Sequence, residues 1–226
     1  MKKWTLDLLF PRWCLGCGRE GSYLCPACQG TLVEITAPLC PRCGCPEPEG
    51  KFCSACAHET SVLNGIRAPF RFEGLVRDAI HQLKYRNLRA LAEPLARLLY
   101  NFLQTNPMPT DVLVPLPIHD KRWRERGYNQ SELLAQELGK LTGLTVVTNS
   151  LVRTGFSNPQ TSTTNVRERR QNVAGAFTCL DERLENLRVL LIDDVATSGS
   201  TLSAAAEALN AKGVRSVWGL VLAREL

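Results

Sequence analysis

The chain has 226 residues, of which 44% are hydrophobic, 22% charged and 7% aromatic, and its formal net charge is +5. This composition is too apolar for a disordered chain and too poor in Gly and Pro for a fibrous one, and the length suits one domain or one domain with a small module. Because we find no run of about 18 apolar residues and no small-residue cleavage site after the short apolar start, we expect a cytoplasmic protein with no integral membrane segment.

The cysteines and the charges divide the sequence into two parts. Nine of the ten cysteines lie between Cys14 and Cys56. Residues 1–60 carry six Lys and Arg against six Asp and Glu, whereas residues 61–188 carry eighteen against twelve. We therefore expect a cysteine-rich module over residues 1–60 and a main domain over residues 61–226, whose modest basic excess suits a phosphorylated ligand or nucleic acid.

Four Cys-x-x-Cys pairs dominate the first module. Two such turns bring four thiolates to one zinc ion, and a reducing cytosol disfavours a disulfide framework, which is the main alternative. Pairing of neighbouring turns needs only short ribbons and is favoured over interleaving. Cys45 is a spare thiol that could replace Cys43, and His58 could replace Cys56. The expected ligands of two structural zinc ions are Cys14, Cys17, Cys25, Cys28, Cys40, Cys43, Cys53 and Cys56.

Apolar periodicity predicts alternating strands and helices in the main domain. A strand is expected over residues 66–72, and a helix with apolar positions from Leu75 to Leu83 follows it. A second helical stretch covers residues 88–103, and Pro94 should kink or divide it. The alternation indicates an α/β fold, in which helices flank a mostly parallel sheet. The remaining expected strands are residues 111–114, 144–147, 189–192 and 216–222, and the remaining helices are residues 131–141 and 200–212.

Two polar segments of the main domain carry candidate binding residues. A basic loop follows the strand that ends at Pro115, and it could supply cations and N–H groups to a pyrophosphate, although such a run is as typical of a solvated surface. Residues 154–172 form a long segment that could close as a lid. Trp123 and Tyr128 look exposed among the arginines and could stack on bases. The candidates are Lys121, Arg122, Arg126 and Asn129 in the basic loop, and Arg153, Arg167, Arg169 and Arg170 in or beside the lid.

The most informative segment is residues 189–201. Four apolar residues predict an interior strand, and Asp193 and Asp194 follow at its carboxyl end, where ligands bind in open α/β sheets. Adjacent carboxylates accept hydrogen bonds from vicinal hydroxyls or position hydrated Mg²⁺, and N–H groups at a helix N-terminus hold phosphate. A sugar phosphate would use both halves, whereas the alternative is an acidic strand end before a capped helix. The loop residues that would hold the phosphate are Thr197, Ser198, Gly199, Ser200 and Thr201.

This segment resembles the phosphoribosyl pyrophosphate (PRPP) motif of type I phosphoribosyltransferases. The resemblance implies that Asp193 and Asp194 contact the ribose hydroxyls, that the loop holds the 5′-phosphate, and that Mg²⁺ accompanies PRPP. Ala196 departs from the motif, which usually has a larger aliphatic residue there. Together with the Cys-x-x-Cys pairs and with residues 81–85, 126–131 and 169–177, the motif resembles the ComF family over nearly the whole chain.

The resemblance implies a phosphoribosyltransferase-like domain behind a double zinc ribbon, in a protein of DNA uptake, natural transformation or the use of external DNA. Three functions stay open. The first is the binding of internalised single-stranded DNA, with PRPP or a related sugar phosphate as ligand. The second is transfer of ribose 5-phosphate from PRPP to a nucleobase or amine. The third is an adaptor role, in which the zinc module binds a protein partner such as a DNA translocase. No segment identifies an acceptor or a catalytic residue.

Overall fold

A parallel sheet of six strands lies at the centre of the computed structural model, which describes residues 11–58, 61–154, 175–180 and 182–226. The strand order is β1-β8-β7-β3-β4, with β2 also paired to β8, and every pairing in this sheet is parallel. The mostly parallel α/β fold is thus confirmed. The strands are β1 (Gly65–Arg67), β2 (Phe70–Arg71), β3 (Val112–Pro115), β4 (Thr145–Val146), β7 (Arg188–Ala196) and β8 (Ser216–Arg224).

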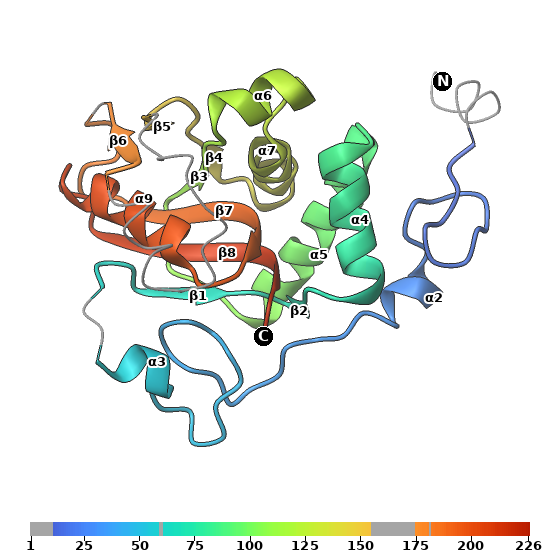
Figure 1. The fold of residues 1–226 in the computed structure, drawn as a ribbon, viewed down its shortest axis with the longest axis horizontal. Helices are drawn as coiled ribbons and strands as arrows, with labels where there is room; N and C mark the ends of the chain where they lie inside the picture. The colour runs from blue at the N-terminus through green and yellow to red at the C-terminus, as the bar shows by residue number, and fades with distance from the viewer. Residues whose placement is uncertain (1–10, 59–60, 155–174, 181) are drawn as a thin grey trace.

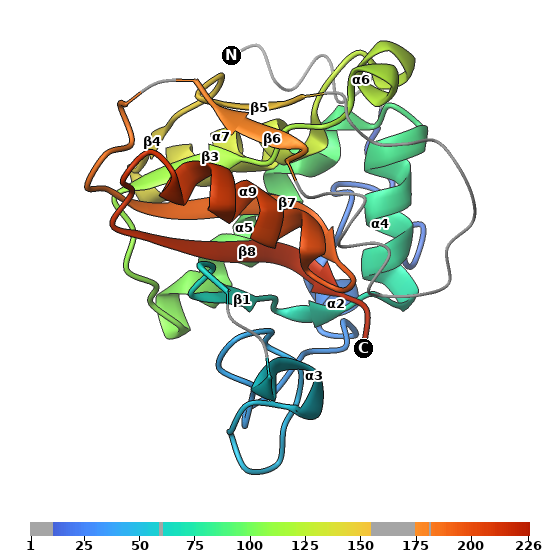
Figure 2. The same ribbon diagram turned by 60° about the vertical axis from the view of Figure 1, so that its left-hand side comes forward.

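Helices cover both faces of this sheet (Figures 1 and 2). Side chains alternate along a strand, so Leu191 of β7 packs in the core beneath α9, whereas Leu190 and Ile192 pack in the core on the opposite face. Each fully buried Leu or Ile contributes about 1.5–3 kcal/mol through the hydrophobic effect. One face carries α9 (Ser200–Asn210), and the other carries α4 (Gly74–Tyr85), α5 (Ala92–Thr105) and α7 (Gln130–Thr142).

The two elements predicted around proline differ from the structure. The strand expected over residues 66–72 is divided into β1 and β2 because Pro69, which has no N–H for a ladder, lies between them. Pro94 does not kink a helix. It lies in the first turn of α5, where a missing N–H costs no helical hydrogen bond, and a short 3₁₀ turn (Arg89–Leu91) precedes that helix.

The basic segment expected to be a loop forms a short helix, α6 (Asp120–Arg126). The ring nitrogen Nδ1 of His119 accepts a hydrogen bond from the backbone N–H of Lys121 and caps its start, and Gly127 ends it with a φ of 71°. A second structure that periodicity did not predict is the antiparallel pair of β5 (Leu151–Arg153) and β6 (Phe177–Cys179), which packs on the same core as α9. Residues 155–174, with Arg167, Arg169 and Arg170 of the predicted lid, lie outside the described residues.

The cysteine-rich module consists of two ribbons of similar design. An isolated bridge joins Trp13 to Glu20 in the first ribbon and Leu39 to Pro46 in the second, and the short helices α2 (Pro26–Gln29) and α3 (Ser54–Ala57) follow. The second ribbon contacts the sheet through its backbone, since the N–H of Ile66 in β1 donates to the carbonyl of Arg42 at 2.7 Å. Within the described ranges, no helix combines the length and the apolar character needed to cross a membrane.

Candidate functional site

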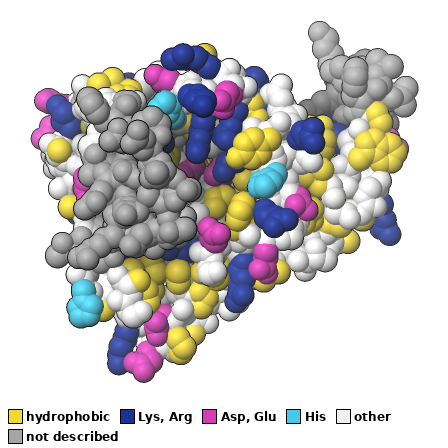
Figure 3. All heavy atoms as spheres, in the orientation of Figure 1, with side chains coloured by type: hydrophobic (Ala, Val, Ile, Leu, Met, Phe, Trp, Pro, Cys, Tyr) yellow, Lys and Arg dark blue, Asp and Glu magenta, His cyan; other side chains and the backbone are white. Residues whose placement is uncertain are grey.

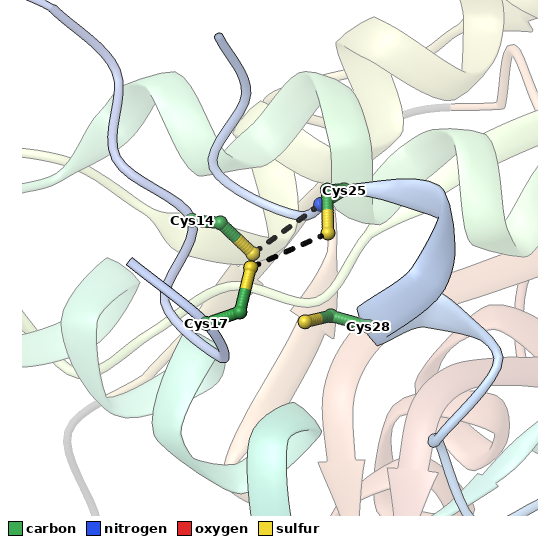
Figure 4. Close-up of side chains that lie close together, drawn as sticks. All are labelled: Cys14, Cys17, Cys25 and Cys28. Atoms are coloured by element: carbon green, nitrogen blue, oxygen red, sulfur yellow. Dashed lines mark hydrogen bonds between the residues drawn. The ribbon is translucent and has the colours of Figure 1, made fainter. Parts of the chain in front are cut away.

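The structure gathers eight of the cysteines into two four-thiol clusters. In each cluster the four sulfur atoms lie within 4.8 Å of one another, and the clusters follow the neighbour pairing favoured from the sequence. Figure 4 shows the four side chains of the first cluster pointing toward one another. Four converging thiols suit one tetrahedral zinc ion, because Zn²⁺ prefers sulfur ligands at about 2.3 Å. The clusters are Cys14, Cys17, Cys25 and Cys28, and Cys40, Cys43, Cys53 and Cys56.

The two proposed substitute ligands lie outside these clusters. His58 belongs to neither of them. Cys45 also stays outside, and its sulfur atom accepts a hydrogen bond from Nε of Arg224 at 3.0 Å. The spare thiol of the module therefore contacts the last residue of β8, and it also interacts with Cys43 of the second cluster without being one of the four grouped ligands.

Strand β7 carries Asp193 and Asp194 to the carboxyl edge of the sheet. The strand does not end before them as predicted. It continues to Ala196, because its backbone stays paired with β8 through that residue. Both carboxylates therefore project from a central strand, and the parallel pairing with β8 fixes the backbone that carries them. The N–H of Asp194 donates to Oδ1 of Asp193 at 2.9 Å.

Two further residues fix these carboxylates, and sequence reasoning assigned neither of them a role. Nζ of Lys84, in the last turn of α4, lies 2.7 Å from Oδ1 of Asp194. The hydroxyl of Ser131, at the start of α7, donates to Oδ1 of Asp193 at 2.7 Å. Both residues belong to segments that carried the family resemblance, at residues 81–85 and 126–131, and this was the only signal that pointed to them.

The environment of the pair suits a ligand that donates hydrogen bonds or a hard cation. Desolvation raises the pKa of Asp193, and the neighbouring Asp194 carboxylate raises it further, against the opposite effects of Lys84 and Ser131. Asp194 is 2% exposed, and its buried Oδ2 atom has no hydrogen-bond partner among the described residues. A buried carboxylate oxygen without a partner is costly. Ribose hydroxyls or the water shell of Mg²⁺ would supply the missing donors, so the residues fit that metal.

The hydroxyl-rich loop turns the chain from β7 into α9. Gly199 has a φ of 78°, and a Cβ atom there would lie 2.5 Å from Cδ1 of Ile66, so only glycine fits both the conformation and the space. The hydroxyls of Ser198 and Ser200 lie 2.8 Å apart. The first N–H groups of α9 have no helical acceptors, and the loop brings them to the same edge of the sheet as the carboxylates.

The predicted basic residues occupy different places around this edge. Lys121 and Arg122 are exposed on α6, and the guanidinium of Arg126 lies 5.1 Å from the ring centroid of Tyr85. Asn129 caps α7, because its side-chain oxygen accepts from the N–H of Ser131 at 3.0 Å. Arg153 lies near both Arg122 and Asp193. Burial and Arg122 lower the pKa of its guanidinium, and Asp193 raises it.

Tyr128 is not an exposed aromatic residue, which corrects the sequence interpretation. Its side chain is 6% exposed, its hydroxyl donates to the carbonyl of Leu83, and Arg89 lies 4.5 Å from its ring centroid. The ring is buried because it packs in the core formed with α4. Trp123 is 55% exposed, as expected, and Tyr85 is 67% exposed.

Known proteins share both parts of this chain. Residues 5–57 match the double zinc ribbon domain, and residues 85–225 match the phosphoribosyl transferase domain. Competence protein F of Haemophilus influenzae is 30% identical over 211 residues, which cover 88% of this chain and 90% of that protein. The chain belongs to the ComF family. Competence protein ComFC of Bacillus subtilis is 28% identical over 200 residues, which cover 84% of this chain and 79% of that protein.

Another relative has a name that refers to DNA. DNA utilization protein YhgH of Salmonella typhimurium is 28% identical over 209 residues, which cover 90% of this chain and 91% of that protein. This ComF-family protein therefore joins a zinc-binding double ribbon to a phosphoribosyltransferase-like domain. The Asp193 and Asp194 pair and the loop before α9 lie within the second matched region.

Proposed function

We propose that this ComF-family protein acts in DNA uptake or in the use of external DNA, and that its main domain binds PRPP or a related sugar phosphate. One observation carries the ligand proposal. In the part of the chain that the structure describes, the buried Oδ2 atom of Asp194 has no hydrogen-bond partner at the carboxyl edge of the sheet, directly before a loop and a helix N-terminus. Ribose hydroxyls would donate to Asp193 and Asp194, and the 5′-phosphate would accept from N–H groups of residues 197–201.

A Mg²⁺ ion bound with PRPP would neutralise charge on the pyrophosphate. In this chain Asp193 and Asp194 are the residues that would orient the ion's water shell. Lys84 already offsets the charge of Asp194, so the pair can stay close together before ligand binds. A cytoplasmic location fits this proposal, because internalised DNA enters the cytoplasm and the reducing conditions there keep the cysteine thiols available to bind zinc.

Titration calorimetry with PRPP and Mg²⁺ tests this site. Asp193→Asn removes one charge but keeps the shape, and Thr201→Val removes a loop hydroxyl. We expect each variant to bind PRPP about tenfold or more weakly, because charge-assisted hydrogen bonds are lost. Asp78→Asn, on the exposed side of α4, is the matched control and should bind like the wild type. Equal PRPP affinity in all four proteins would refute the proposed site.

The surface beside the site supports binding of single-stranded DNA. Figure 3 shows Lys and Arg side chains gathered over the region of α6. Trp123 and Tyr85 are exposed there, and Arg126 covers the ring of Tyr85. Exposed aromatic rings among cations form a platform on which bases stack while the backbone phosphates meet positive charge.

Fluorescence anisotropy with an oligo-dT strand tests this surface. Tyr85→Ala and Trp123→Ala should each weaken binding by about 1–3 kcal/mol, and the affinity should fall steeply as salt is raised. Trp13→Ala is the control, because Trp13 is 54% exposed on the first ribbon. The absence of any binding at low salt would contradict the proposal. If only Trp13→Ala weakened binding, the DNA would bind at the zinc ribbons and not at the surface around α6.

An active phosphoribosyltransferase is a second candidate, favoured by Arg153. Its guanidinium lies near Asp193, where it could balance charge on a departing pyrophosphate. In that reaction the bond from C1 of ribose to pyrophosphate breaks, a bond from C1 to nitrogen forms, and the acceptor loses a proton. Pyrophosphate release from PRPP with a panel of nucleobases and amines tests it. Release that falls in Arg153→Met supports transfer, and no release with any acceptor excludes it for that panel.

A further inference from the structure

Arg224 is a buried cation with unused hydrogen-bonding capacity. The residue is 4% exposed at the end of β8, and its Nε atom donates to the sulfur of Cys45. Its Nη1 atom is buried and has no hydrogen-bond partner within the described ranges. Among the residues that the structure describes, no carboxylate forms an ion pair with Arg224. A guanidinium keeps its charge and offers five N–H donors, so a buried one normally meets a carboxylate or phosphate.

Arg224 lines a cavity of about 200 Å³ between the second ribbon and the hydroxyl-rich loop (residues 197–201) that leads into α9. From the ribbon it is lined by Arg42, by Ala55 and by four cysteines, of which Cys43, Cys53 and Cys56 belong to the second cluster and Cys45 does not. Ser61, Leu63 and Ile66 line it from the segment that enters β1, and Ser198 and Ser203 line it from the loop and from α9. The volume lies below the range of about 300–1,000 Å³ typical of sites for whole drug-sized ligands. The cavity therefore suits a single small group.

Apart from the cysteines, three of which would bind zinc, the polar part of the lining consists of two arginines and three hydroxyl groups, which suit an anion. No carboxylate lies among the lining residues. Ser203 lies in the first turn of α9, an 11-residue helix whose N-terminus carries a partial positive charge. Arg67 interacts electrostatically with Cys40 and Cys43 and therefore offsets part of the negative charge that the second cluster carries when it binds zinc. Arg42 donates a hydrogen bond to the backbone carbonyl of Cys56 at 2.7 Å. Arg224 is the lining cation that still has an unpaired buried N–H.

We propose that this cavity is a second anion site, which takes one phosphate group on Arg224 and on the hydroxyls of Ser198 and Ser203. The phosphate belongs either to free inorganic phosphate or to a small sugar phosphate. The site lies on the ribbon side of the loop, and it differs from the backbone N–H groups proposed for PRPP. A phosphate bound there would bridge the second ribbon and the loop.

Titration calorimetry on the full-length, zinc-loaded protein tests this proposal. Saturating PRPP with Mg²⁺ first fills the site at Asp193 and Asp194, and inorganic phosphate is then titrated at constant ionic strength. A second arm titrates ribose 5-phosphate, which distinguishes the two sources of the phosphate group. If PRPP itself fails to bind, the difference in phosphate affinity between the wild type and Arg224→Met still reports on the Arg224 cavity, so the two proposals can fail separately.

Three variants and one control connect the binding to the cavity. Arg224→Met removes the charge. Arg224→Lys keeps the charge but removes the planar guanidinium, and Ser203→Ala removes one hydroxyl. We expect Arg224→Met to bind phosphate about tenfold or more weakly, and the other two to bind with intermediate affinity. Arg215→Met is the matched control, because it removes the same charge from an exposed position just before β8 and should bind like the wild type.

Thermal unfolding separates binding from folding. With PRPP and Mg²⁺ already saturating, phosphate should raise the Tm of the wild type and of Arg215→Met but leave that of Arg224→Met unchanged. Replacing a buried ion by an apolar side chain is often neutral for stability, so Arg224→Met should fold. If it does not, Ser203→Ala and Arg224→Lys carry the test. Phosphate binding that is equal in the Arg224 variants and in Arg215→Met would overturn the proposal and leave Arg224 only its contact with Cys45.

Discussion

The carbonyl of Leu83 lies in the last turn of α4, where the helix supplies few N–H partners, and the hydroxyl of Tyr128 donates to it. Tyr128→Phe would leave this buried carbonyl unsatisfied. We expect the free energy of unfolding in urea to fall by about 1–3 kcal/mol, and the affinity for single-stranded DNA to stay unchanged because the ring is buried. Tyr85→Phe, at an exposed ring, should leave stability unchanged. Weaker DNA binding by a fully stable Tyr128→Phe would contradict the structural role and assign the hydroxyl of Tyr128 to DNA binding.

Lys84 and Asp194 form an ion pair in which both side chains are mostly buried, with 17% and 3% of them exposed. Lys84→Met would leave the carboxylate buried without its counter-charge, at a cost of about 3–5 kcal/mol in the free energy of unfolding. The exposed pair of Lys140 and Glu137 is the control, and Lys140→Met should cost less than about 1 kcal/mol. Urea unfolding measures both. Adding Asp194→Asn to Lys84→Met should recover part of the lost stability. Similar losses in Lys84→Met and in Lys140→Met would argue against a stabilising pair of Lys84 and Asp194.

At the scale of elements, the helices and strands that bury the most apolar surface are the ones that the sequence predicts best. Helix α4 is predicted well because Val76, Ala79, Ile80 and Leu83 are all buried on one face. Helix α6 has no buried residue, so no periodicity reveals it, and its caps at His119 and Gly127 define it instead. The strands β5 and β6 have three residues each, too few to show alternation. Strand β7 extends past its apolar residues because backbone pairing, which the sequence does not display, continues to Ala196.

The same limit applies to the candidate site. Contiguous residues such as Asp193, Asp194 and the loop to Thr201 are visible in the sequence because one strand-loop-helix unit carries them. Lys84 and Ser131 reach the pair from α4 and α7, which are far away along the chain, and only the packing of those helices brings them there. Composition alone does not reveal such contacts.

Strands β3 and β7 are tied at their start by Asp111 and Arg188. The guanidinium and the backbone N–H of Arg188 both donate to this carboxylate, and these hydrogen bonds with Arg188 lower the pKa of Asp111 to about 2. A lowered pKa in the folded state stabilises the protein above the unfolded pKa of about 4, and the stabilisation is lost as the pH falls toward 2. Asp111→Asn should therefore lower the Tm at pH 7, and its difference from the wild type should shrink below pH 4. A difference that stays constant with pH would contradict this role of the ion pair.

At the scale of the whole molecule, the two ribbons contact the main domain differently. The second ribbon makes hydrogen bonds with the central sheet, from Ile66 to the carbonyl of Arg42 and from Arg224 to Cys45. The first ribbon contributes Leu24, with Leu15 and Tyr23 partly buried, to the core on the α4 face. Short ribbons bury little core of their own, so bound zinc should supply much of their folding free energy. Losing either zinc should unfold its own ribbon, but only the second ribbon's loss directly removes hydrogen bonds to β1 and β8.

Cys28→Ser and Cys53→Ser test this asymmetry, because each removes one ligand from one cluster. Elemental analysis should find two zinc ions per chain in the wild type and one in each variant, since three remaining ligands hold structural zinc weakly. The Tm should fall further in Cys53→Ser than in Cys28→Ser, and trypsin should cut the variant ribbon while residues 61–154 and 182–226 stay resistant in Cys28→Ser. Cys179→Ser, which changes a cysteine outside both clusters, should keep two zinc ions. Equal losses of Tm in the two cluster variants would show that the hydrogen bonds of the second ribbon do not stabilise the sheet, and two zinc ions in Cys53→Ser would mean that Cys45 completes the site.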